Sequence, residues 1–290
     1  MKKHLTRGTM LALLATLPLP PALAADWNDP QEPFALFGDT YYVGTRGLSS
    51  VLITSPAGHI LIDGGSPKSP VQIVRHIGQL GFRIEDVKYI LNSHEHLDHA
   101  GGIAELQRLS GATVLASVEG ERVLRTGETS KGDPQYSDLP PTMPAVANTR
   151  AVKHGDIIKL GPLSVTAHYT PGHTQGGTSW TWRSAEGGKT ASMVYGDSLN
   201  AMSAGPFRYS ASNTYPHARA DLDKSIATVA AFDCDVLVSA HPEGSGLWER
   251  LAKQATMGNA AFIDRDACRD YADAARERLA RKLAAEAGQK

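Results

Sequence analysis

Short apolar runs separated by turns dominate the chain from residue 41 onward. The runs are rich in aliphatic and β-branched residues, which is typical of neighbouring strands in one sheet. In the first half of the chain these predicted strands cover residues 41–44, 50–54, 59–62, 87–91 and 112–116. Between them, apolar residues recur at helical spacing and predict helices over 70–80, 103–109 and 118–125. The first half therefore alternates strands with helices.

The second half repeats this theme. Its predicted strands cover 151–159, 163–169, 178–182, 192–195 and 236–239, and its helices cover 222–232 and two segments at the C-terminus, the last from about residue 264. Leu163, Val165 and Ala167 alternate with polar residues, which indicates one buried face. The charged residues of the last helix indicate a solvated face. Two similar halves predict an α/β fold, a four-layer αββα sandwich.

Residues 126–149 interrupt the pattern. They contain four prolines and two glycines with little periodicity, so we expect a long loop. Loops of this length in compact enzymes either line a substrate cleft or link two subdomains, and the sequence leaves both interpretations open.

The N-terminus has the pattern of a secretory signal peptide. Basic residues precede a short apolar stretch that ends in Ala22-Leu23-Ala24, a pattern typical of signal cleavage. The stretch is too short to span a bilayer stably. We therefore expect residues 1–24 to be removed and residues 25–290 to form a single soluble domain, periplasmic in a Gram-negative bacterium and not bound to membrane.

Composition narrows the class of partner. The chain is 41% hydrophobic and 20% charged, as in an ordinary globular enzyme, and its formal net charge is -1. Its charge and the absence of a basic run argue against electrostatic binding of nucleic acid, so we expect a small-molecule partner. We also expect a monomer. Cys234 and Cys268 both lie in the exported part, where a disulfide is favoured over two buried thiols.

The segment His94-Glu95-His96-Leu97-Asp98-His99 carries the strongest chemical signal. Three imidazoles and an aspartate fall within six residues at the end of a predicted strand, where ligands of α/β sheets gather. Such a cluster without metal would leave several partly buried polar groups without partners. The glycines at 101 and 102 permit a close approach of backbone. We therefore predict a metal site here.

Two further histidines stand in similar settings. His173 follows an apolar strand in Thr170-Pro171-Gly172-His173, and His241 follows another in Ser239-Ala240-His241. Together with the first cluster they give six candidate ligands, enough for two metals with open positions for water. The remaining histidines lack this context, and we expect them to be structural or on the surface.

On these motifs the chain resembles the metallo-β-lactamase superfamily from about Asp63 to His241. Asp63, the 94–99 run, His173, Asp197-Ser198 and His241 correspond to its five motifs. Within it the chain is most similar to the class B β-lactamases of subclass B3, because Ser198 stands where other subclasses have a cysteine ligand. Asn200 departs from the pattern, in which a serine or threonine helps to hold the substrate carboxylate.

The resemblance implies an αββα fold, two Zn²⁺ ions and hydrolysis of the β-lactam amide of penicillins, cephalosporins and carbapenems, which confers antibiotic resistance. Metal-bound hydroxide would attack the amide, with no covalent acyl-enzyme. The implied ligands are His94, His96 and His173 for one zinc and Asp98, His99 and His241 for the other. Asp98 would orient the hydroxide, and Ser198 and Asn200 would bind the substrate carboxylate.

The sequence leaves two alternative functions open. A thioester or lactone hydrolase of the same superfamily, similar to glyoxalase II, would use the same nucleophile, and a bridging Asp197 would favour it; we expect Asp197 to lie behind the ligands instead. An exported zinc-binding protein without turnover is the non-enzymatic alternative. Open coordination positions argue against it, since a storage site has no use for them.

Overall fold

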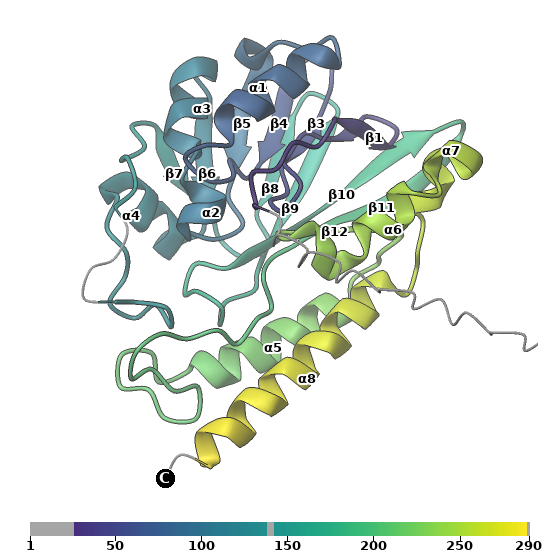
Figure 1. Cartoon of the computed structure of the whole chain (residues 1–290). Helices are drawn as coiled ribbons and strands as arrows, with labels where there is room; N and C mark the ends of the chain where they lie inside the picture. The colour runs from purple at the N-terminus through teal and green to yellow at the C-terminus, as the bar shows by residue number, and fades with distance from the viewer. Residues whose placement is uncertain (1–25, 138–141, 289–290) are drawn as a thin grey trace, which may run out of the picture.

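Two β-sheets pack face to face in this computed structural model, which describes residues 26–137 and 142–288 (Figure 1). The expected signal peptide, residues 1–24, lies outside the described residues. The first sheet runs in the order β1 (Phe34–Phe37), β2 (Thr40–Tyr42), β3 (Val51–Ile53), β4 (His59–Ile62), β5 (Val87–Leu91), β6 (Thr113–Ala116) and β7 (Thr149–Ala151). The second runs in the order β12 (Val236–Ser239), β11 (Lys189–Gly196), β10 (Thr178–Glu186), β9 (Leu163–Tyr169) and β8 (Ile157–Leu160).

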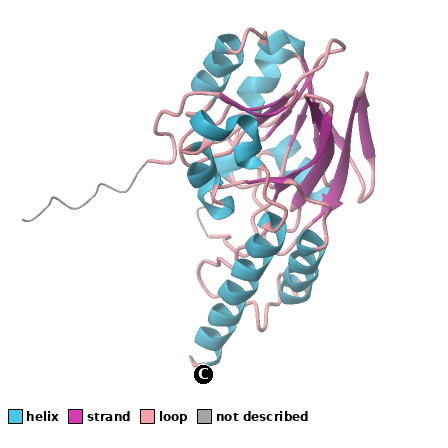
Figure 2. Cartoon of the chain, turned by 90° about the vertical axis from the view of Figure 1, so that its right-hand side faces the viewer, coloured by secondary structure: helices cyan, strands magenta, loops and turns pink. Residues whose placement is uncertain are grey.

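Helices cover the outer faces of both sheets. Those near the first sheet are α1 (Pro70–Gln79), α2 (Leu97–Ala100), α3 (Ile103–Ser110) and α4 (Val118–Thr126). Those that follow the second sheet in sequence are α5 (Ala218–Ala230), α6 (Leu247–Leu251), α7 (Gln254–Met257) and α8 (Ala267–Ala287), with short 3₁₀ turns at Ile84–Asp86, Pro242–Ser245 and Gly258–Phe262. In Figure 2 the strands form one group, and α8 runs away from them to the C-terminal end.

The near-continuous apolar run of β4 explains the layering. Ile60 and Ile62 are buried between the two sheets, whereas Leu61, on the opposite face, packs among residues of α1 and α3. A strand covered on both faces is apolar at nearly every position, and each buried aliphatic side chain contributes about 1.5–3 kcal/mol. The αββα sandwich expected from the sequence is therefore confirmed.

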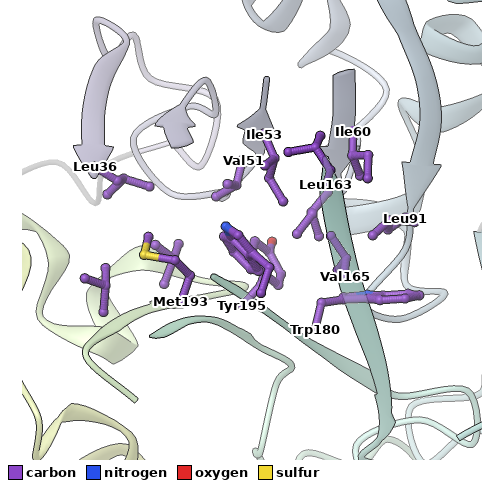
Figure 3. Close-up of a cluster of buried hydrophobic side chains, with 14 of the residues drawn as sticks. Leu36, Val51, Ile53, Ile60, Leu91, Leu163, Val165, Trp180, Met193 and Tyr195 are labelled. Carbon is purple, nitrogen blue, oxygen red and sulfur yellow. The ribbon is translucent and has the colours of Figure 1, made fainter. Parts of the chain in front are cut away.

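The core between the sheets is filled from both sides. Figure 3 shows Val51, Ile53 and Ile60 of the first sheet facing Val165 and Tyr195 of the second. Another cluster of buried hydrophobic residues joins the outer face of β11 and β12 to the helices α5 and α8. These two helices lie side by side (Figure 1). The packing on these faces holds both sheets in place, and the loops that follow their strands extend from this packed core.

A disulfide joins Cys234, which follows α5, to Cys268 in the first turn of α8. This confirms the pairing expected from the sequence. The bond closes a separation of 34 residues and fixes α8 against the second sheet. Within the described ranges, no helix is long and apolar enough to cross a membrane.

Most sequence-based elements agree with the structure, but some strands differ. The predicted strand 151–159 is wrong, because β7 ends one sheet at Ala151 and β8 begins the other at Ile157. Between them Gly155 adopts a positive φ of 84°, which glycine tolerates and which turns the chain. The strand β1 was not expected, and β10 and β11 extend further than their apolar runs, into a hairpin at residues 187–188.

Candidate metal centre

The predicted ligands come together where strands of both sheets end. β5 delivers the 94–99 segment, β9 leads to His173, and β12 leads to His241. β5 runs parallel to β4 and β12 runs parallel to β11, so the carboxyl ends of these pairs open at a common edge. The topology therefore explains how residues far apart in sequence reach one site.

His94, His96 and His173 form one cluster of donors. Each offers a ring nitrogen, and these nitrogens lie within 4.8 Å of one another. The ring centroids are 4.8–5.0 Å apart, and the rings are nearly perpendicular. Nε2 of His94 is buried and has no hydrogen-bond partner. A buried nitrogen lone pair without a partner is costly, and a metal ion in this cluster would satisfy it.

Asp98, His99 and His241 form a second, tighter cluster. Oδ2 of Asp98 lies 3.1 Å from Nε2 of His99 and 3.3 Å from Nε2 of His241. The two histidine nitrogens are 3.2 Å apart. Tetrahedral ligands at ordinary zinc distances are separated by about 3.3 Å, so the spacing of these three atoms fits one zinc ion. His94 also lies close to Asp98 and His99, which makes the two clusters adjacent.

In His173, His241 and His96, the ring nitrogen that faces away from the cluster has a hydrogen-bond partner in the protein. Nδ1 of His173 donates to the backbone oxygen of Asn200 at 2.7 Å, and Nδ1 of His241 donates to that of Gly47 at 3.1 Å. Nε2 of His96 donates to Oδ2 of Asp133 at 2.9 Å. Metal-binding histidines characteristically have such partners, which fix the tautomer and the ring orientation.

Two buried aspartates lie beneath the clusters. Oδ1 of Asp197 is 2.9 Å from Nδ1 of His94, on the side of the ring opposite its free nitrogen. Oδ2 of Asp63 is 3.7 Å from Nδ1 of His99. Asp197 contacts an imidazole from behind, and the two sets of mutually close donor atoms at the site do not include it.

Asp63 also fixes the segment that precedes the histidine run. Its carboxylate accepts hydrogen bonds from the backbone and hydroxyl of Ser93 at 2.7 and 2.5 Å and from Tyr195 at 2.8 Å. Its own φ is 59°, a strained conformation for a residue with a side chain. Close by, a Cβ on Gly102 would lie 2.2 Å from the oxygen of Gly64, so only glycine permits this packing.

The surroundings of the site favour neutral imidazoles at His94 and His173 and an ionised carboxylate at Asp98, whereas the carboxylates beside His99 favour its protonated form. Burial lowers the pKa of His94 well below its ordinary value and that of His173 to about 3. Burial alone would raise the pKa of Asp98, but the charge and hydrogen bonds of His99 and His241 lower it strongly. Burial disfavours charge on His99, yet Asp98 and Asp63 raise its pKa to about 10.

A cavity of about 570 Å³ opens above both clusters. Ser198 and Asn200, the predicted substrate-binding residues, line it, as does His241. The long segment 126–149 contributes further wall residues, including Asp133 and Met143. Of the two interpretations left open by the sequence, the structure therefore supports the cleft-lining loop.

Several residues of the site were not found from the sequence, among them Asp133, Trp27 and Arg278. Asp133 lies in the aperiodic loop, 37 residues from the histidine that it contacts, and no local signal identified it. Trp27 lines the cavity with its ring 5.2 Å from that of His241. Arg278 lines it from α8, where the charged residues were interpreted as a solvated face. Its spacing of seven from Tyr271, another lining residue, is the signal that could have revealed it.

Comparisons with known proteins agree with this geometry. MEM-A1, a subclass B3 metallo-beta-lactamase isolated from a soil metagenome library, is 71% identical with a TM-score of 0.90, and the match covers 91% of this chain and 100% of that chain. Rm3 metallo-beta-lactamase is 56% identical with a TM-score of 0.88, over 90% of this chain and 96% of that chain.

More distant relatives share only part of the chain. The hydroxyacylglutathione hydrolase of Maricaulis maris (strain MCS10) is 34% identical over 104 residues, which are 36% of this chain. The match covers 31% of the length of this relative. The metallo-beta-lactamase superfamily itself is matched over residues 43–241, the stretch that carries all six predicted ligands. The chain belongs to the metallo-beta-lactamase superfamily and, within it, to subclass B3.

Proposed function

We propose that this protein is a zinc-dependent β-lactamase that hydrolyses the amide bond of penicillins, cephalosporins and carbapenems and thereby confers antibiotic resistance. The observation that carries the proposal is the meeting of two donor clusters in one cavity, on a chain 71% identical over its matched length to a subclass B3 enzyme. A zinc-storage protein would need no substrate-sized cavity above its ligands.

The first zinc is assigned to His94, His96 and His173, and the second to Asp98, His99 and His241. The compact spacing of the donor atoms and the partners behind His96, His173 and His241 support this assignment. Zinc bound there would supply Lewis acidity for the lactam carbonyl and a nucleophile derived from water at neutral pH.

The protein itself positions the reactants. The carboxylate of Asp98 lies in the second cluster beside His99 and His241, where it would accept a hydrogen bond from the attacking water and relay a proton to the leaving amide nitrogen. Ser198 and Asn200 form the wall that receives the substrate carboxylate. The rigid sheets behind these groups keep them oriented before substrate arrives.

A covalent route through Ser198 is disfavoured. A nucleophilic serine needs a base within hydrogen-bond reach, and among the described residues no histidine or carboxylate hydrogen-bonds the Ser198 hydroxyl. Direct attack by water that zinc would activate requires no acyl-enzyme.

We also infer export with removal of residues 1–24, leaving a periplasmic domain of residues 25–290 that works as a monomer. The disulfide between Cys234 and Cys268 supports an oxidising compartment. Mass spectrometry of protein expressed from the full gene tests the cleavage: the mature chain should begin at Ala25, and a retained Met1 would refute this inference.

A substrate panel tests the activity. Purified mature protein with zinc is assayed against nitrocefin, a carbapenem and a hydroxyacylglutathione thioester, with and without EDTA. We expect fast turnover of both β-lactams, weak or no thioester hydrolysis, and loss of all turnover in EDTA. Chelator-sensitive thioester hydrolysis without β-lactam turnover would replace the proposal with the glyoxalase II-like alternative.

A further inference from the structure

The side chain of Arg278 brings a permanent positive charge to the wall of the cavity. Among the described residues that line this cavity, it is the only lysine or arginine. It lies on α8 seven residues after Tyr271, so both side chains share one face of the helix. The Tyr271 hydroxyl donates to the backbone oxygen of Asp197 at 2.8 Å and accepts from the amide of Leu199 at 3.3 Å. This face of α8 therefore packs directly against the segment that carries Ser198.

Arg278 differs from the other basic residues of its helix. These have a carboxylate within ion-pair distance, in the pairs Arg269–Asp266, Arg276–Asp273, Arg281–Glu277 and Lys282–Glu286. Arg278 has no ion pair within residues 26–137 and 142–288, and its Nε is buried without a hydrogen-bond partner. A partly buried guanidinium without an acidic partner is unfavourable unless a ligand completes it.

The position of the charge also fits the site. Side chains of helices lean toward the N-terminus, which directs Arg278 toward Tyr271. Burial raises the pKa of Tyr271, and the charge of Arg278 opposes this rise, as expected for a guanidinium close to that hydroxyl. The neighbouring wall residues Ser198 and Asn200 offer only neutral hydrogen-bond donors.

We propose that Arg278 is the specificity-determining cation of the site and that it pairs with the carboxylate of the substrate. This inference rests on the proposed function, in which the substrate carries a carboxylate beside the reacting amide. Ser198 and Asn200 then contribute neutral hydrogen bonds, and Arg278 contributes the charge. A planar guanidinium is suited to this role because it binds a carboxylate through two parallel N–H groups.

Substrates with and without the negative charge test the proposal. The wild-type protein is compared with R278Q on nitrocefin and on the methyl ester of its carboxylate. In R278Q, KM for the acid should rise at least tenfold with kcat little changed, because the charge-assisted contact with the substrate carboxylate is lost. Kinetics with the ester should stay the same, so the preference for acid over ester falls at least tenfold.

The control variant is R276Q, which removes an exposed arginine from the same helix. It should keep the wild-type preference, and both variants should keep the wild-type zinc content and thermal midpoint. Should R278Q fail to fold, R278K carries the test: a lysine point charge lacks the fork geometry, so KM should rise for the acid alone.

An unchanged preference for the acid in folded R278Q would overturn the role of Arg278 while leaving the proposed function intact. Equal losses on acid and ester would also overturn it, because they would indicate a structural role. If the wild-type protein hydrolysed neither compound, the proposed function would fail and the role of Arg278 with it.

Discussion

The hydrogen bond between His96 and Asp133 provides a sharp test of how the site holds its metal. Nε2 of His96 donates to Oδ2 of Asp133, while Oδ1 of the same carboxylate accepts a hydrogen bond from the backbone N–H of Gln135 at 2.6 Å. In Asp133→Asn the amide oxygen would keep the bond to Gln135, and the NH₂ group would face His96. Two donors would then oppose each other, so the imidazole would have to place its proton on Nδ1, the nitrogen left for a metal.

The structure sets the size of the effect. The bond is 2.9 Å long, and the Asp133 side chain is only 1% exposed, so solvent cannot replace it. A hydrogen bond to a charged group contributes about 1.5–3 kcal/mol. This corresponds to about 10–100-fold in zinc affinity, the range found when such partners of metal-binding histidines are removed.

Zinc affinity is measured by competition with a chromophoric chelator, and kcat/KM is measured with nitrocefin. Both should fall in Asp133→Asn, whereas the exposed control Asp223→Asn should match the wild-type protein. Thermal unfolding in EDTA separates a local effect from loss of the fold. Zinc affinity within twofold of wild type in a folded Asp133→Asn protein would refute the reasoning.

Three further outcomes follow from the structure. His96→Ala removes a donor nitrogen and should abolish nitrocefin turnover with less bound zinc per chain; near-normal turnover would refute the ligand assignment. Replacing Cys234 and Cys268 by serine opens the 34-residue loop and should lower the free energy of unfolding by about 4 kcal/mol, measured with urea; no change would show that the bond stabilises nothing. Burial would raise the pKa of Glu286, but hydrogen bonds from the backbone amides of Ser210 and Tyr209 lower this pKa below its ordinary value of 4.5. Its stabilisation is therefore present at neutral pH and lost as pH falls through the lowered pKa, so Glu286→Gln should destabilise at pH 7 and match wild type at strongly acidic pH. A stability difference independent of pH would contradict this.

The sequence predicted those parts of the molecule that depend on local patterns. The run 59–62 identified a strand, and the histidine run identified the metal centre, because strand patterns and ligand spacing are both short-range. The disulfide was predictable from two cysteines in a chain whose N-terminus has the pattern of a signal peptide.

Features that depend on distant contacts were not predictable. Asp133 meets His96 across 37 residues, from a loop whose path is fixed only by the folded protein. Arg278 belongs to a charged helix in which composition alone indicates solvent, and only the packing of α8 beneath Ser198 places it in the cavity. The strand predicted at 151–159 failed because the turn at Gly155 sends the chain from one sheet to the other.

Zinc titration of the metal-free protein tests the central claim most directly. The protein is stripped with a chelator and reloaded stepwise, while bound zinc per chain and the rate of nitrocefin hydrolysis are recorded together. We predict no turnover without zinc, full turnover after reloading, and saturation at two zinc ions per chain. Turnover in the stripped protein, or an inactive protein with two zinc ions bound, would contradict the account.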